Sequence, residues 1–156
     1  MPDDRSLPAQ ILSTLGNWAK GELQITVILA LIYIIGFALA HVPAWFLLGP
    51  LCGFLYLVPI IGGPIGLVLT LAISFFAGRP IGYILAALAV WVFAQALEGF
   101  YLTPQILGKR TQLGPLAVFV GVICASALFG PLGIIFAVPV MSVALVIYRY
   151  FNKPTT

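Results

Sequence analysis

The sequence has very little charge. Only 7% of its 156 residues are charged and 62% are hydrophobic, whereas soluble domains average roughly 25% charged residues. This composition excludes an ordinary soluble domain and indicates an integral membrane protein. The four acidic residues and one histidine include no pair at ligand spacing, so neither a metal site nor a cofactor is expected.

Catalytic motifs and a nucleic-acid-binding surface are also lacking. The chain contains no His-Glu-x-x-His or Gly-x-Ser-x-Gly motif, so no known arrangement supplies a nucleophile, base or metal ligand. The net charge of +3 is small and spread over loop positions, which makes it information about membrane topology. The sequence therefore predicts neither an enzyme nor a nucleic-acid partner.

Cysteine is scarce as well. Cys52 and Cys124 both lie inside apolar runs. This placement favours small side chains in a reduced setting over a disulfide. Both cysteines are expected to be buried and unpaired.

Long apolar runs make up most of what is present. They predict an all-α protein, a polytopic transmembrane helix bundle of about six apolar segments with a short N-terminal amphipathic helix. Residues 1–22 form the amphipathic segment, at the cytoplasmic interface or on a neighbouring subunit. Residues 23–148 form the transmembrane domain, and residues 149–156 form a basic cytoplasmic tail.

The first span is Leu23–Ala40, about 18 residues, which is close to the thickness of the hydrocarbon layer. Three further spans are predicted at Ile81–Leu97, Leu113–Leu128 and Ile134–Tyr148. A break at Gly130–Gly133 separates the last two, and Pro139 is expected to interrupt the final one.

The apolar run from Ala44 to Ala77 is interrupted by Pro59, Gly62, Gly63 and Pro64. Proline removes a backbone donor and glycine permits irregular dihedral angles. Because lipid offers no hydrogen-bond partner, protein or cavity water must satisfy the freed backbone groups. This stretch is therefore either a tight turn between two short spans or a re-entrant tip that lines a pathway.

A polar island at 95–115 stands in the middle of the apolar chain. Trp91, Gln95, Glu98 and Leu102 follow at i, i+4, i+7 and i+11, so they form one helical stripe that should face the bundle interior. The helix is expected to extend no further than Thr103, because a residue before proline disfavours helical dihedrals.

Two interpretations of Glu98 remain open. An acid near a span is a functional-site hypothesis, here a proton relay. The alternative is an interfacial carboxylate paired with Lys109 or Arg110.

The distribution of basic residues predicts orientation. One side of the membrane would collect six of the seven basic residues, and the other side only Arg79. Because basic loops stay in the cytoplasm, both termini are expected there. The six are Arg5, Lys20, Lys109, Arg110, Arg149 and Lys153.

Three motifs in order carry a family resemblance: LVPIIGGPIG at 57–66, QALEGFYLTPQILGKRTQLGPLAV at 95–118 and LFGPLGIIFAVPV at 128–140. Together they resemble the C-terminal half of the autoinducer-2 exporter family of bacterial permeases. The resemblance implies a multi-pass protein of the bacterial inner (plasma) membrane with cytoplasmic termini, assembled as an oligomer. Family members export a small signalling molecule, and some relatives are described as cation/proton antiporters.

The sequence therefore predicts a membrane transporter that exports a small polar, autoinducer-2-like molecule, coupled to protons or cations. It would work as a homo-oligomer in the lipid bilayer. The alternative is a non-transporting scaffold subunit or a truncated fragment of a full-length permease. The candidate pathway residues are Pro59, Gly62, Gly63, Pro64, Gln95, Glu98, Pro104, Gln105, Gly108, Lys109, Gly130 and Gly133.

Overall fold

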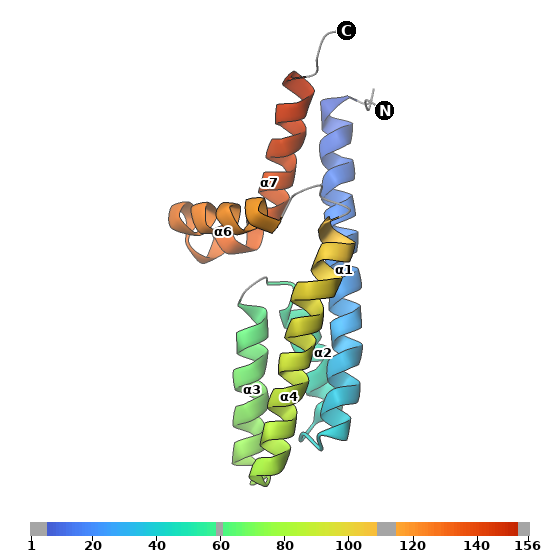
Figure 1. Cartoon of the computed structure of the whole chain (residues 1–156), viewed down its shortest axis with the longest axis vertical. Coiled ribbons are helices and arrows are strands. Elements are labelled where there is room, and N and C mark those ends of the chain that lie inside the picture. Colours follow the sequence, from blue (N-terminus) through green and yellow to red (C-terminus); the bar gives the residue numbers. More distant parts are fainter. Residues whose placement is uncertain (1–5, 59–60, 109–114, 153–156) are drawn as a thin grey trace. The chain divides into compact units, whose positions relative to one another are not determined.

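The structure is a computed structural model that describes residues 6–58, 61–108 and 115–152 (Figure 1). All regular structure in these ranges is helical, which confirms the all-α class. The elements are α1 (Leu7–Leu39), α2 (Trp45–Leu55), α3 (Gly62–Phe76), α4 (Ile81–Leu97), η1 (Glu98–Gly108), α6 (Pro115–Phe129) and α7 (Pro131–Phe151).

The chain forms two compact units. One unit comprises Glu22–Thr103, and the other comprises Met1–Gly21 together with Pro104–Thr156. Helix α1 runs without a break across the first boundary. The predicted amphipathic segment and the first predicted span are therefore parts of one continuous helix.

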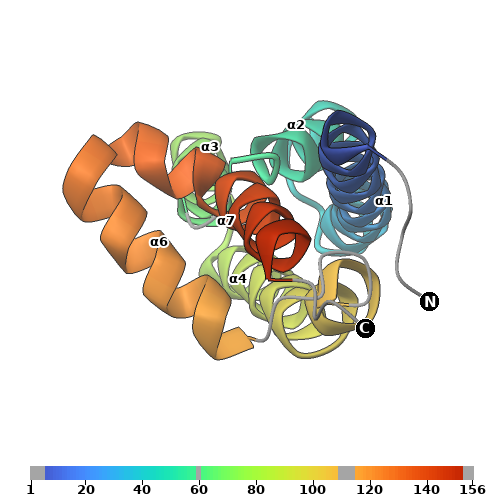
Figure 2. The same ribbon diagram turned by 90° about the horizontal axis from the view of Figure 1, so that it is seen from above.

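Helices α1, α2, α3 and α4 lie side by side in the unit of residues 22–103 (Figures 1 and 2). The face of α1 that points inward carries Ile25, Leu29, Tyr33 and Phe37, all buried and each four residues from the next. The opposite face carries exposed Val27, Leu31, Ile35 and Leu39. An apolar face this continuous is unfavourable in water and suits contact with lipid.

Glycines allow these helices to approach closely. A Cβ placed on Gly53 would lie 2.5 Å from the Cβ of Ala30, and one on Gly49 would lie 2.7 Å from the Cα of Ile34. Helix α2 therefore packs on α1 with its backbone almost in contact. This is the use of small residues that helix association in membranes favours, because close backbones gain van der Waals contact.

The interrupted run from Ala44 to Ala77 forms two short helices. Helix α2 has 11 residues and α3 has 15, so they are about 16 and 22 Å long, shorter than a hydrocarbon core of about 30 Å. Two helices of the described chain are long and apolar enough to cross a membrane, Leu7–Leu39 and Ile81–Thr103. Both readings of the α2–α3 pair, two short spans or a re-entrant tip, remain predictions.

Helix α4 occupies the predicted span Ile81–Leu97 and continues as η1, a π-helix that ends at Gly108. The expectation that the helix stops at Thr103 was wrong, because η1 passes through Pro104. A π-helix pairs backbone groups five residues apart, and such segments are frequent at functional sites.

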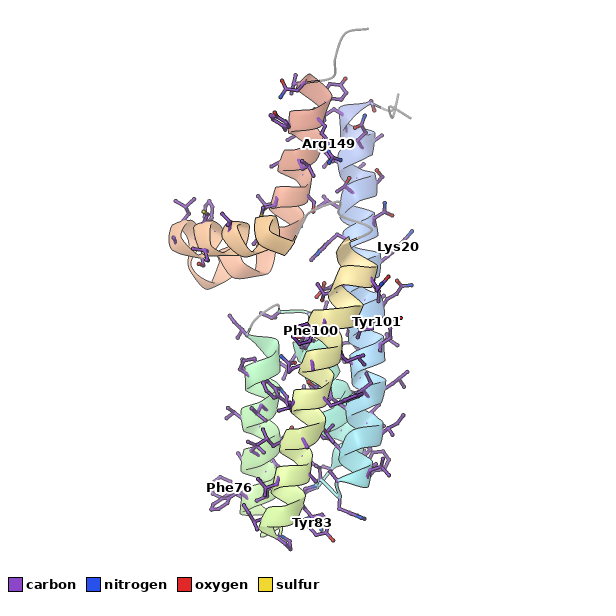
Figure 3. All side chains as sticks on the ribbon, viewed as in Figure 1. Lys20, Phe76, Tyr83, Phe100, Tyr101 and Arg149 are labelled. Atoms are coloured by element: carbon purple, nitrogen blue, oxygen red, sulfur yellow. The ribbon has the colours of Figure 1, made fainter. Side chains whose placement is uncertain are left out.

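Exposed aromatic side chains lie at both ends of α4. Phe76 and Tyr83 flank the turn before it, and Phe100 and Tyr101 lie on η1 (Figure 3). The 17 residues of α4 separate these groups by about 25 Å. Tyrosine concentrates where a membrane meets water, so the separation of Tyr83 from Tyr101 is that of a helix crossing the hydrocarbon layer.

In the other unit, α6 and α7 form a hairpin. Gly130 makes the turn with φ of 61°, which favours glycine. A Cβ on Gly133 would lie 1.9 Å from the carbonyl oxygen of Ala125, so the two helices meet at this glycine. Pro139 lies inside α7 and does not end it, contrary to the predicted interruption.

The cysteine prediction holds for one residue of the two. Cys52 is buried and free, and its Sγ lies 3.6 Å from Oγ1 of Thr70. Cys124 is free but exposed on α6. The expectation of burial was wrong there, because an apolar run does not reveal which of its faces is turned outward.

Candidate functional site

The predicted stripe on α4 faces the interior of its bundle. Trp91 donates from Nε1 to the carbonyl oxygen of Gly63 at 2.9 Å. The Gln95 amide lies against the Cα of the same glycine, since a Cβ there would be 3.0 Å from Nε2 of Gln95. Leu102 is buried. The stripe prediction is confirmed, and α4 holds the first turn of α3 through Gly63.

Glu98 is the centre of a hydrogen-bonded cluster. The hydroxyl of Tyr56, at the C-terminal cap of α2, donates to Oε2 of Glu98 at 2.7 Å. The hydroxyl of Thr103 donates to Oε1. Both carboxylate oxygens therefore accept a hydrogen bond, an arrangement that stabilises an ionised carboxylate.

The α2–α3 connection is packed against this cluster. The N–H of Gly62 donates to the carbonyl oxygen of Val58 at 2.9 Å, and a Cβ on Gly62 would lie 1.8 Å from the carbonyl oxygen of Leu55. Gln95 lies beside the Tyr56 hydroxyl, and its buried Oε1 has no hydrogen-bond partner in the described structure. Gln95 thus contacts Gly63, and both Gln95 and Glu98 lie beside the Tyr56 hydroxyl.

Helix α1 contributes polar residues that the sequence reasoning missed. Glu22, Thr26 and Tyr33 lie on its buried face with exposed fractions of 7%, 1% and 1%. Glu22 lies close enough to Glu98 for their charges to repel, and Tyr33 interacts electrostatically with Glu98. Their helical spacing was a usable signal, because Thr26 and Tyr33 follow Glu22 by four and eleven residues.

Glu22 and Glu98 have no compensating cation nearby in the unit of residues 22–103. Between Glu22 and Thr103 the charged residues are Glu22, Arg79 and Glu98. Arg79 lies in the turn before α4, and the 17 residues of α4 separate it from Glu98 by about 25 Å. Two acids that share a poorly solvated region without a cation repel each other and resist simultaneous ionisation.

The remaining predicted residues lie elsewhere. Pro64 is exposed on the first turn of α3. Pro59 and Lys109, and Arg110 with them, are outside the described residues. The proposed pairing of Glu98 with Lys109 or Arg110 therefore stays a prediction. The other unit contains Pro104, Gln105, Gly108, Gly130 and Gly133.

Short broken helices, an apolar outer face and buried polar side chains define an α-helical membrane protein with a polar site inside its bundle. Residues 3–153 of the chain match the sequence model of a protein family described as "AI-2E family transporter". It therefore belongs to the AI-2E transporter family.

Curated relatives carry the corresponding names. The chain is 36% identical over 124 residues to "Putative transport protein sll0063" of Synechocystis, covering 79% of this chain and 30% of that protein. It is 31% identical over 130 residues to "Putative transport protein YueF" of Bacillus subtilis, covering 83% of this chain and 35% of that protein. The chain thus spans about a third of the length of these relatives. No solved structure matches it.

Proposed function

We propose that this chain works in the bacterial inner membrane as a transporter that exports a small polar molecule of the autoinducer-2 type. Transport is coupled to a proton or a cation at the cluster around Glu98. Both termini lie in the cytoplasm, and the working form is a homo-oligomer. Family membership supports the transport class, and the substrate, coupling and assembly are the proposal.

The hydrogen-bonded position of Glu98 is the observation that carries the proposal. Its carboxylate accepts from Tyr56 at the end of α2 and from Thr103 in η1. It therefore joins the two interrupted elements of the bundle, the α2–α3 connection and the π-helix. Transporters place coupling ions where helices are broken, because free backbone groups and polar side chains meet there.

Reconstitution of the purified 156-residue chain in liposomes tests this function. Internal pH and uptake of small polar signals of the autoinducer-2 class are followed together, in the native chain and in Glu98→Gln. We expect flux in the native chain and a loss of at least about tenfold in the variant, because the amide cannot exchange a proton at neutral pH or present a negative charge.

Asp4→Asn is the matched control, because it removes one negative charge from the N-terminal segment and should leave flux unchanged. Full flux with full pH dependence in Glu98→Gln would remove Glu98 from the coupling mechanism. No flux from a folded, oligomeric preparation of the native chain would favour the scaffold or fragment alternative. Light scattering on the same preparation measures the oligomer.

A further inference from the structure

The buried face of α1 carries more polar groups than packing requires. Thr26 and Tyr33 are each 1% exposed, and neither hydroxyl has a hydrogen-bond partner in the described structure. A buried hydroxyl without a partner is destabilising, because it has given up its hydrogen bonds to water. Tyr33 lies within electrostatic range of Glu98, and Thr26 is one helical turn from Glu22. Both unpaired hydroxyls therefore lie on the buried face of α1 that also carries Glu22.

The two acids differ in their surroundings. Glu98 receives hydrogen bonds from Tyr56 and Thr103. The carboxyl group of Glu22 receives none from the residues that the structure describes, although the residue is only 7% exposed. An ionised carboxylate needs donors, whereas a protonated carboxyl group is neutral and tolerates burial. The asymmetry therefore assigns the negative charge to Glu98 and neutrality to Glu22.

Among the residues that the structure describes, the titratable groups interacting with the pair do not supply a positive charge. Tyr33 comes from α1, and Cys52 and Tyr56 come from α2. These side chains are neutral in their ordinary protonated forms. Helix α3 has no titratable residue. Lys20 precedes Glu22 by two positions, and residues two apart on a helix do not face each other.

We propose that Glu22 and Glu98 form one acidic site that binds a single proton, which Glu22 holds while Glu98 remains ionised. The inference rests on the proposed transport function for its role, since a proton held by Glu22 is the coupling ion. Protonation of Glu98 would cancel the charge that the hydroxyls of Tyr56 and Thr103 stabilise. The pair thereby links α1 to the ends of α2 and α4.

The chain offers an unusually direct test because Glu22 and Glu98 are its only two glutamates. Protein labelled with carbon-13 at the glutamate side-chain carboxyl, in lipid nanodiscs, gives nuclear magnetic resonance signals from these two groups alone. Titration of the native chain should show one protonated and one ionised glutamate at neutral pH. Two ionised glutamates there would overturn the proposal.

Substitutions assign the two signals. Glu22→Gln should remove the protonated signal and leave Glu98 ionised at neutral pH. Glu98→Gln should lower the proton affinity of Glu22 by at least about tenfold, because the neighbouring negative charge is gone. An unchanged titration of Glu22 in Glu98→Gln would overturn the shared site.

A salt comparison separates a proton from a metal cation. Sodium chloride and choline chloride at equal ionic strength should give the same glutamate signals at fixed pH. A shift with sodium alone would overturn the proton assignment. The native titration requires no substitution and no transport, so a failed flux assay with an intact shared proton would contradict the proposed function and not this site.

Discussion

At the scale of single residues, two adjacent glycines at the start of α3 have different surroundings. A Cβ on Gly62 would meet the backbone oxygen of Leu55 at 1.8 Å, whereas one on Gly63 would meet the side-chain amide of Gln95 at 3.0 Å. A side chain can move aside more cheaply than a backbone carbonyl. Gly62 is therefore the less replaceable of the two.

Gly62→Ala should accordingly lower the midpoint of thermal unfolding more than Gly63→Ala, with a cost of about 1–3 kcal/mol for the overpacked site. The matched control is Gly82→Ala on α4, where a Cβ meets nothing within 4 Å. That change should stabilise by about 0.4–1 kcal/mol, because alanine restricts the unfolded chain. Thermal scans of the purified variants in detergent measure all three, and equal midpoints for Gly62→Ala and Gly82→Ala would contradict the geometry.

At the scale of elements, helix α1 is held against α4 at Gly36. A Cβ on Gly36 would lie 2.4 Å from Cγ1 of Val90 and 3.0 Å from Cγ2. Glu22 lies on α1, and Glu98 begins η1 directly after the last residue of α4. Spacing between these helices therefore governs both stability and the acidic site.

Gly36→Ala should destabilise the bundle, and Val90→Ala should recover part of the loss by removing the two methyl groups that clash. The substitutions at Gly36 and Val90 are expected to show a coupling energy of about 0.5–3 kcal/mol, the range for residues in contact. Unfolding midpoints of the two single variants and the double variant complete the cycle. Strictly additive effects would mean that α1 and α4 are not in contact there.

At the scale of the whole molecule, charge predicts orientation. Arg79 lies in the exposed turn between α3 and α4 and is the only basic residue assigned to the outer side. The exposed Asn152 follows α7 near the basic C-terminus. The positive-inside bias places these two residues on opposite sides of the membrane.

Cysteine labelling in cells measures this orientation. In a background without Cys52 and Cys124, Arg79→Cys should react with a membrane-impermeant maleimide in intact spheroplasts. Asn152→Cys should react only after permeabilisation. The reverse pattern would invert the predicted topology, and labelling of both in intact cells would contradict the assignment of the C-terminus to the cytoplasm.

The sequence by itself determined the features that depend on local order. Low charge and long apolar runs determine the membrane class, and the run Ile81–Leu97 is a helix in the structure with the predicted bounds. Helical spacing also predicted that Gln95 and Glu98 point inward. Local patterns wrongly predicted that the helix ends before Pro104 and that Cys124 is buried. The backbone pairing of a π-helix and the outward face of α6 both depend on more than neighbouring residues.

Only the tertiary structure decided which residues meet. Tyr56 and Glu98 are 42 positions apart and share a hydrogen bond, and Glu22 approaches Glu98 from a third element. Periodicity indicates which face of a helix is buried, but not which residue of another helix lies opposite. That choice follows from close packing at Gly36, Gly49 and Gly53, where contact with a side chain or with the backbone of the neighbouring helix sets the position of each helix.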